Sequence, residues 1–159
     1  MAQYFLESSA LAKRYKQETG TSFVNKLFLN PQNKLFYLNL AVVEIRKIFY
    51  RLWMYPQTFE NDVQINDDDF RSLESRFYAD IQKMTRIDFT QDMIDKANDI
   101  LEKQWLKSVF DLVHLSSYLI ITQDYPEMIF VCSDKRSNLI NASRQFIPDQ
   151  KIIVPEMTY

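Results

Sequence analysis

Four acidic residues stand apart from the other acids because apolar residues surround them or lead into them. Glu7 and Asp134 each follow an apolar segment and precede a predicted helix, whereas Glu44 and Asp111 lie inside apolar runs. A carboxylate in such surroundings loses hydration, so it needs a hydrogen-bonding partner, a raised pKa or a metal ion. Taken singly, each acid is better explained by a helix cap or by a hydrogen bond to a nearby Ser or Lys. If all four converge, their repulsion calls for a cation, and oxygen ligands suit Mg²⁺ or Mn²⁺.

The single histidine and the single cysteine do not indicate a nucleophilic site. His114 lies three residues after Asp111 on a predicted helix, but no reactive Ser or Cys accompanies it, so we favour a hydrogen-bonded structural histidine over a catalytic triad. Cys132 lies in an apolar run and is predicted to be a buried strand residue. One cysteine also excludes an internal disulfide and a Cys-rich zinc site, and it favours a cytoplasmic location.

Basic residues follow two of the four acids at similar distances. Lys13 lies beyond Glu7, and Lys135 and Arg136 lie directly after Asp134. These residues either form solvated helix faces or flank the acidic centre and hold a phosphate backbone. The net charge is −2, so any surface that binds nucleic acid has to be local.

Segments with the spacing of strands alternate with segments of helical spacing along the 159 residues. The pattern predicts strands near residues 4–6, 35–39, 86–89, 128–132 and 151–154, with helices between them. Such alternation is typical of an α/β fold with a largely parallel sheet, and the length suits one domain. Ligands bind at the carboxyl edge of an open parallel sheet, which is where Glu7 and Asp134 are expected. No run approaches the roughly 20 apolar residues of a membrane span.

Several local signals predict how the helices begin and end. Ser8 and Ser9 are expected to cap the opening helix, and Gly20 is expected to end it in the left-handed conformation. Residues 55–69 are predicted to form an exposed excursion, whose acidic end 67–69 caps the following helix rather than binding calcium. An apolar stripe on the second helix either packs in the core or meets a second copy of the chain; it comprises Phe23, Val24, Leu27 and Phe28.

Four motifs, in chain order, resemble those of PIN-domain proteins and of VapC-like toxins in particular. They are YFLESSALAKRY at 4–15, VVEI at 42–45, FDLVHL at 110–115 and FVCSDKR at 130–136. The resemblance covers nearly the whole chain and implies a single PIN-like domain over residues 1–159. The implied fold has three α/β/α layers around a mostly parallel sheet.

The resemblance also implies an activity: metal-dependent cleavage of single-stranded or structured RNA by the toxin of a toxin–antitoxin pair. The implied direct ligands of Mg²⁺ or Mn²⁺ are Glu7, Asp111 and Asp134. Glu44 would either bind the metal ion itself or contact one of the groups that bind it. The implied substrate contacts are Ser8, Ser9, Lys13, Lys135 and Arg136.

The implied partners are an RNA substrate, a small antitoxin protein and a second copy of the chain in a homodimer; no membrane association is expected. The chain departs from the family pattern at the first acid, which is ordinarily Asp and is here Glu7. This departure predicts that metal binding survives and that turnover is weak. The alternative is a degenerate PIN module that binds RNA or a protein without cutting.

Overall fold

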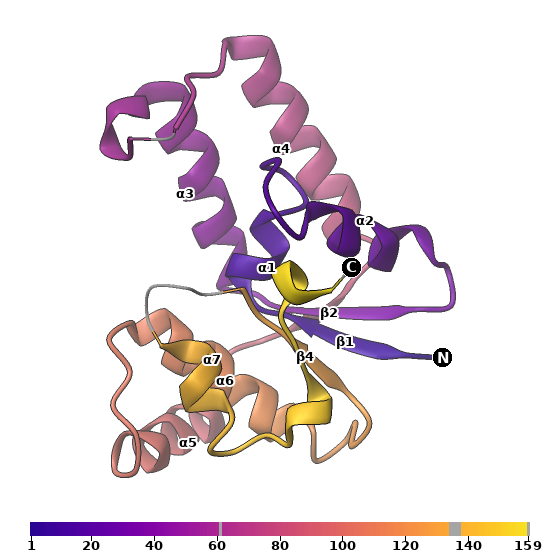
Figure 1. Cartoon of the computed structure of the whole chain (residues 1–159), viewed down its shortest axis with the longest axis vertical. Helices are drawn as coiled ribbons and strands as arrows, with labels where there is room; N and C mark the ends of the chain where they lie inside the picture. The colour runs from indigo at the N-terminus through magenta and orange to yellow at the C-terminus, as the bar shows by residue number, and fades with distance from the viewer. Residues whose placement is uncertain (61, 134–137, 159) are drawn as a thin grey trace.

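Five parallel strands form one sheet in a computed structural model of the chain, which describes residues 1–60, 62–133 and 138–158 (Figure 1). The spatial order is β3-β2-β1-β4-β5. The strands are β1 (Gln3–Leu6), β2 (Lys34–Leu38), β3 (Thr85–Ile87), β4 (Ile129–Val131) and β5 (Ile152–Ile153). Each lies where the spacing of apolar residues predicted a strand. All neighbouring pairs are parallel, so the predicted α/β class is confirmed.

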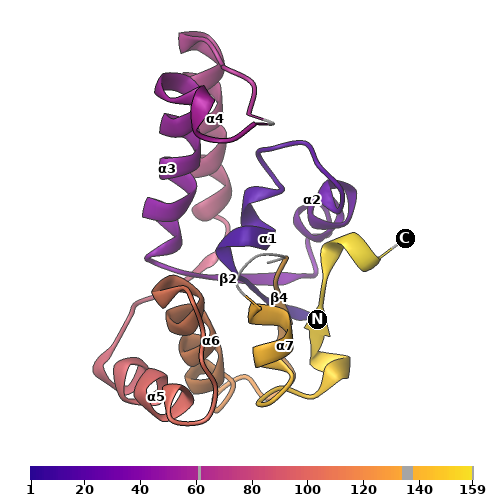
Figure 2. The same cartoon turned by 60° about the vertical axis from the view of Figure 1, so that its left-hand side comes forward.

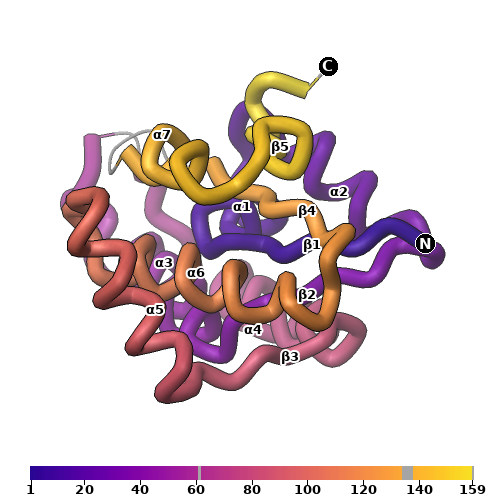
Figure 3. Tube along the Cα trace, turned by 90° about the horizontal axis from the view of Figure 1, so that it is seen from below, coloured from indigo at the N-terminus to yellow at the C-terminus, as the bar shows by residue number. Residues whose placement is uncertain are grey.

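Helices cover both faces of the sheet because successive side chains of a strand point to opposite faces. Phe5 faces the layer formed by α5 (Gln91–Leu101), α6 (Val109–Ile121) and α7 (Leu139–Ser143). Leu6 faces the layer formed by α1 (Ser8–Ala12), α2 (Thr21–Leu29), α3 (Ala41–Met54) and α4 (Asp67–Ile81). The sheet therefore separates two apolar cores, and α5 and α6 lie side by side on the first of them (Figure 3). The predicted three-layer α/β/α arrangement is confirmed.

Helices α3 and α4 continue past the sheet as an arm, on the side away from α5, α6 and α7 (Figure 2). Trp53 stacks on Phe70 with ring centroids 4.6 Å apart, which joins the two helices near the tip. The connection includes the short helix η1 (Pro56–Thr58) and forms the predicted excursion. The acids at 67–69 were predicted to cap the following helix, but they lie in the first turn of α4. The side chain of Asn66 caps that helix, so α4 begins at Asp67 rather than at Phe70.

Two further predicted caps are wrong. Glu7, and not either serine, caps α1, because its carboxylate accepts a hydrogen bond from the backbone N–H of Ser9 at 2.9 Å. Gly20 has the predicted left-handed conformation, with φ 92°, but it precedes α2 as its N-cap and does not end α1. α1 is short and ends at Ala12, so the chain makes a separate turn before Gly20.

The carboxyl-terminal segment returns to the same side of the sheet as α2. It consists of η2 (Asp149–Lys151), β5 and η3 (Pro155–Met157). A Cβ atom on Gly20 would lie 2.8 Å from the Cβ atom of Pro155, so glycine allows η3 to pack closely against the start of α2. Among the described residues, no helix has the length and apolar character needed to cross a bilayer.

Candidate functional site

Glu7 occupies the carboxyl end of β1, the central strand of the sheet. Its backbone N–H donates to the carbonyl oxygen of Val131 at 3.0 Å, which continues the pairing of β1 with β4 by one residue. The side chain is 1% exposed, and its Oε2 accepts hydrogen bonds from the N–H and the hydroxyl of Ser9. The strand thus delivers a buried carboxylate to the edge at which ligands bind in parallel sheets.

Glu44, His114 and Ser8 form a compact hydrogen-bonded group beside Glu7. Glu44 Oε2 lies 2.6 Å from His114 Nε2 and accepts a hydrogen bond from Ser8 Oγ at 2.5 Å. Ser8 Oγ also lies 2.8 Å from His114 Nε2. Glu44 comes from the first turn of α3 in one layer and His114 from α6 in the other. The group therefore joins the two helical layers at the edge of the sheet.

The acidic cluster, which we define as Glu7, Glu44 and His114, has the donor atoms of a metal site. One donor atom from each residue can be chosen so that all three lie within 4.8 Å of one another. Carboxylate oxygens suit Mg²⁺ and Mn²⁺, and an imidazole nitrogen suits later transition metals, so the two carboxylates fit a divalent cation.

Burial and neighbouring acids raise the pKa of Glu7 from an ordinary value of 4.5 to about 7. Loss of hydration has the largest effect, and the charges of Asp111 and Glu44 act in the same direction. His114 and the hydrogen bond from Ser9 act against this rise but do not cancel it. A cation among these groups would favour ionised Glu7, so the electrostatics and the donor set agree.

His114 is fully buried, and burial alone lowers its pKa. The hydrogen bond with Glu44 and the charges of Glu7, Glu44 and Asp111 outweigh burial, so the pKa of His114 is raised. No hydrogen-bond partner for Nδ1 occurs among the described residues, so neutral His114 carries its proton on Nε2 and donates it to Glu44. His114 is therefore better suited to orient Glu44 than to bind a metal ion. If Nε2 bound a metal, the proton of neutral His114 would lie on Nδ1, for which no acceptor occurs among the described residues.

The structure brings together part of the predicted site. Glu7 and Glu44 converge, and the half-buried Asp111 in the first turn of α6 is close enough for its charge to act on Glu7 and His114. The other predicted acid, Asp134, lies outside the described residues, as do the predicted substrate contacts Lys135 and Arg136. The prediction that His114 is hydrogen-bonded is confirmed, and Cys132 is buried as predicted.

The predicted substrate contacts Ser8, Ser9 and Lys13 occupy three different positions. Ser8 donates a hydrogen bond from its hydroxyl to Glu44, and Ser9 donates one from its backbone N–H to Glu7. Lys13 is buried, and its Nζ lies 2.9 Å from carboxylate oxygens of Glu18 and Glu156. Their contact with a substrate stays a prediction, whereas their contacts with the protein are evident.

Two residues, His114 and Glu156, were not predicted from the sequence to belong to the site. His114 has a usable signal, because its spacing of three residues from Asp111 places both on one side of a helix. Glu156 has none, because it follows a proline in a three-residue turn far along the chain from Glu7.

A pocket of about 840 Å³ adjoins the acidic cluster at Ser9. Its wall includes Ser133, Lys16, Arg51, Phe59 and Glu156. Lys16 and Arg51 both pair with the buried carboxylate of Asp62, at 2.9 and 2.6 Å. The pocket is large enough for part of a nucleotide. Three cationic side chains line it, together with the acids Glu18, Glu60, Asp62 and Glu156.

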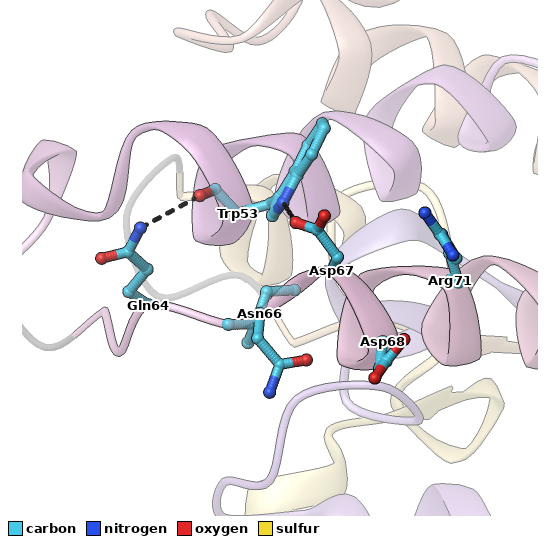
Figure 4. Close-up of a pocket in the computed structure, with 7 residues that line it drawn as sticks. Trp53, Gln64, Asn66, Asp67, Asp68 and Arg71 are labelled. Atoms are coloured by element: carbon cyan, nitrogen blue, oxygen red, sulfur yellow. Dashed lines mark hydrogen bonds between the residues drawn. The ribbon is translucent and has the colours of Figure 1, made fainter.

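A second hollow, of about 640 Å³, lies near the tip of the arm and shares no residue with the acidic cluster (Figure 4). Trp53 Nε1 donates to Asp67 Oδ1 at 2.8 Å across it, and Gln64 Nε2 donates to the carbonyl oxygen of Trp53 at 3.4 Å. These contacts connect the end of α3 to the start of α4. This hollow is therefore part of the junction that shapes the arm.

No protein-family model matches the chain, and no curated protein matches it in sequence. Solved structures do match it in fold. VapBC2 from Rickettsia felis, bound to a DNA fragment from its promoter, has a TM-score of 0.59 at 15% identity, with 96% of this chain and 98% of that chain covered. The fold is PIN-like.

Two further solved structures share this PIN-like fold. FitAcB from Neisseria gonorrhoeae matches with a TM-score of 0.59 at 10% identity, and the match covers 98% of this chain and 99% of that chain. PAE2754 from Pyrobaculum aerophilum matches with a TM-score of 0.54 at 11% identity, over 89% of this chain and 79% of that chain. The fold implied by the four sequence motifs is therefore confirmed.

Proposed function

We propose that this protein is a divalent-metal-dependent endoribonuclease that cleaves single-stranded or structured RNA. The observation that carries this proposal is the convergence of Glu7 and Glu44 with His114, within 4.8 Å, at the carboxyl edge of the sheet. A buried carboxylate at the end of the central strand meets a half-buried carboxylate of α3 there, and the charge of Asp111 acts on the same place. A PIN-like fold supports the same class of activity.

The chain's own residues would hold the cation and the substrate in register. Mg²⁺ or Mn²⁺, when bound, supplies activation of a water and stabilisation of charge on the scissile phosphate. Glu7 and Glu44 would hold the ion, and Asp111 and Asp134 would complete its set of acids. Ser8 and His114 fix the orientation of the Glu44 carboxylate, and Ser9 fixes that of Glu7.

The RNA would approach through the pocket beside Ser9. Lys16 and Arg51 border this pocket, and Lys135 and Arg136 are the further cationic residues proposed for it. The net charge of the chain is negative, so attraction of the phosphate backbone has to come from such a local group. Lys13 is committed to Glu18 and Glu156, so it acts on the shape of the pocket.

The biological setting that fits best is a toxin–antitoxin pair in the cytoplasm. The likeness to the VapBC2 structure supports a toxin role, with a small antitoxin protein as partner. A homodimer is part of the same proposal.

One observation favours a second candidate, a degenerate PIN module that binds RNA or a protein without cutting. The carboxylate oxygens of Glu7 and Glu44 already accept hydrogen bonds from Ser9, Ser8 and His114. A cluster whose charges are offset by protein donors can persist without an ion. The extra methylene of Glu7, relative to Asp, favours the same candidate. It lengthens the side chain, whereas catalysis requires placement of metal ligands to about 0.5 Å.

Cleavage of a labelled single-stranded RNA, in Mn²⁺ and in EDTA, separates the two candidates. We expect weak Mn²⁺-dependent cleavage by the wild type, faster cleavage by Glu7→Asp, and none by Glu7→Gln. Glu127→Gln is the matched control, because that side chain is 86% exposed and loses the same charge. If neither the wild type nor Glu7→Asp cuts RNA at any Mn²⁺ concentration, the module that binds without cutting is the better account.

A further inference from the structure

A buried ion pair connects the carboxyl-terminal turn η3 to the end of α1. Glu156 Oε1 lies 2.9 Å from Lys13 Nζ, and the two side chains are 8% and 5% exposed. Lys13 Nζ also donates to the carbonyl oxygen of Thr19 at 2.9 Å, so its ammonium group is surrounded by oxygens. Burial acts to raise the pKa of Glu156, but the hydrogen bonds from Ser133 and Lys13 outweigh it and lower that pKa. Glu156 is therefore ionised at neutral pH.

Hydrogen bonds continue from this ion pair to the acidic cluster. Ser133 Oγ donates to Glu156 Oε1, and the Ser133 backbone N–H donates to Ser9 Oγ at 2.9 Å. Ser9 Oγ in turn donates to Glu7 Oε2. Glu156 is thus linked to the buried Glu7 carboxylate through two serines, Ser133 just after β4 and Ser9 in the first turn of α1. Ser133 uses its hydroxyl toward Glu156 and its backbone N–H toward Ser9, so the link holds the geometry of Ser9 through the position of Ser133.

Close packing holds η3 in place independently of the ion pair. A Cβ atom on Gly20 would lie 2.8 Å from Pro155 Cβ and 2.9 Å from the backbone carbon of Pro155. The absence of a side chain at Gly20 allows the backbone before Glu156 to rest on the start of α2. The position of the Glu156 carboxylate is therefore set by packing as well as by charge.

A buried ion pair by itself is a poor source of stability, because removing two charges from water offsets most of their attraction. Its value here lies in orientation. We infer that η3 is a clamp on the acidic cluster, and that Glu156 is a positioning residue that acts through Ser133 and Ser9 to fix the Glu7 carboxylate. The effect on metal binding rests on the proposed function, whereas the effect on the two serines does not.

The test compares Glu156→Gln with Asp149→Asn, a matched loss of one carboxylate whose side chain is 80% exposed in the same carboxyl-terminal segment. Amide hydrogen exchange of Ser9 and Ser133 is measured first, without metal. We expect Glu156→Gln to accelerate exchange of these amides about tenfold and to leave the amides of Phe5 and Phe130 in the sheet unchanged. Asp149→Asn should change none of them. Unchanged exchange at Ser133 in Glu156→Gln would overturn the clamp.

Calorimetric titration with Mn²⁺ then tests the positioning of Glu7. We expect Glu156→Gln to weaken Mn²⁺ binding about tenfold, as loss of outer contacts of metal ligands does. If Glu156 acts through Ser9, the double variant with Ser9→Ala should bind no more weakly than Ser9→Ala alone. Additive losses, or wild-type affinity in Glu156→Gln, would contradict the positioning role. No Mn²⁺ binding by the wild type would instead refute the proposed metal site, and the exchange measurement would still decide on the clamp.

Discussion

At the scale of single residues, Glu7 has two roles that compete for the same atoms. Its Oε2 caps α1 through the N–H of Ser9, and the same carboxylate belongs to the acidic cluster. Capping favours the ionised form, whereas burial and the neighbouring acids favour the protonated form, and the second effect dominates. The raised pKa makes the protonation of Glu7 sensitive both to a bound cation and to pH.

The raised pKa of Glu7 predicts that the metal-free protein loses stability as the pH rises. Between pH 4.5 and about 7 the folded state keeps a proton on Glu7 that the unfolded chain has released, so the free energy of unfolding falls over this window. The loss from Glu7 is on the order of 3 kcal/mol. His114 acts in the same direction, because the stability from its raised pKa is present below 6.5 and is lost as the pH passes its folded value.

Urea unfolding in EDTA at pH 5 and pH 8 measures this linkage. We expect the wild type to lose on the order of 3 kcal/mol more than Glu7→Gln between the two values, since glutamine does not titrate. Glu7→Gln also removes the charge of Glu7 that raises the pKa of His114, so the difference between the two proteins reports both groups. Parallel losses in the two proteins would show that Glu7 has an ordinary pKa.

At the scale of elements, the site depends on the places where strands end and helices begin. The ends of β1 and β4 lie together because the two strands are parallel and adjacent, with Leu6 opposite Val131. α3 and α6 approach this edge from opposite layers and bring Glu44 and His114 within 2.6 Å of each other. The short turn η3 closes the same edge through Glu156. The cluster is consequently an assembly of element ends, none of which contains the site alone.

Gly20 is a position at which this assembly tolerates substitution poorly. Gly20→Ala places a Cβ atom on a left-handed residue and 2.8 Å from Pro155 Cβ, so either η3 or α2 has to move. We expect a loss of about 2–4 kcal/mol in the free energy of unfolding, from backbone strain and overpacking together. Chemical denaturation provides the measurement.

Asn138→Ala is the control for the backbone part of this effect. Asn138 is also left-handed, with φ 64°, but it already carries a Cβ atom and is exposed. Its replacement should cost about 1 kcal/mol or less. If Gly20→Ala is no more destabilising than Asn138→Ala, the close contact with Pro155 does not hold η3 in place.

At the scale of the whole molecule, several large apolar side chains remain exposed. Two of the most exposed, Trp105 and Val109, lie at the connection between α5 and α6, and Tyr55 and Val63 lie at the tip of the arm. The stripe on α2 considered for a dimer contact is core packing instead, because Val24 and Leu27 are buried and Phe23 and Phe28 pack against the core. Scattered exposed apolar side chains are ordinary on a protein surface, so these residues do not by themselves indicate association.

The homodimer proposed above is an expectation that the mass in solution tests. Light scattering coupled to size exclusion should give twice the chain mass of 19.1 kDa at micromolar concentration. Dilution should shift the mass toward that of one chain, since association follows mass action. A mass of 19.1 kDa at every concentration would rule the homodimer out.

The sequence by itself determined the alternation of strands and helices, the α/β class and the acids worth attention. These features follow from local periodicity. An apolar run indicates a buried strand, and an acid that follows such a run is expected at the carboxyl edge of a parallel sheet. The four motifs carried the resemblance further, to the PIN-like fold. The predicted acid Asp134 and its basic neighbours lie outside the described residues, so their placement stays a prediction.

Only the tertiary structure decided which groups meet. Ser8 and His114 are 106 positions apart, Ser9 and Ser133 are 124 apart, and no local pattern encodes such contacts. The serines were expected to cap α1, but Glu7 occupies the N-cap position and accepts from the N–H of Ser9, while Ser8 donates to Glu44. The pKa of Glu7 likewise depends on burial and on charges from other elements, which exist only after the chain has folded.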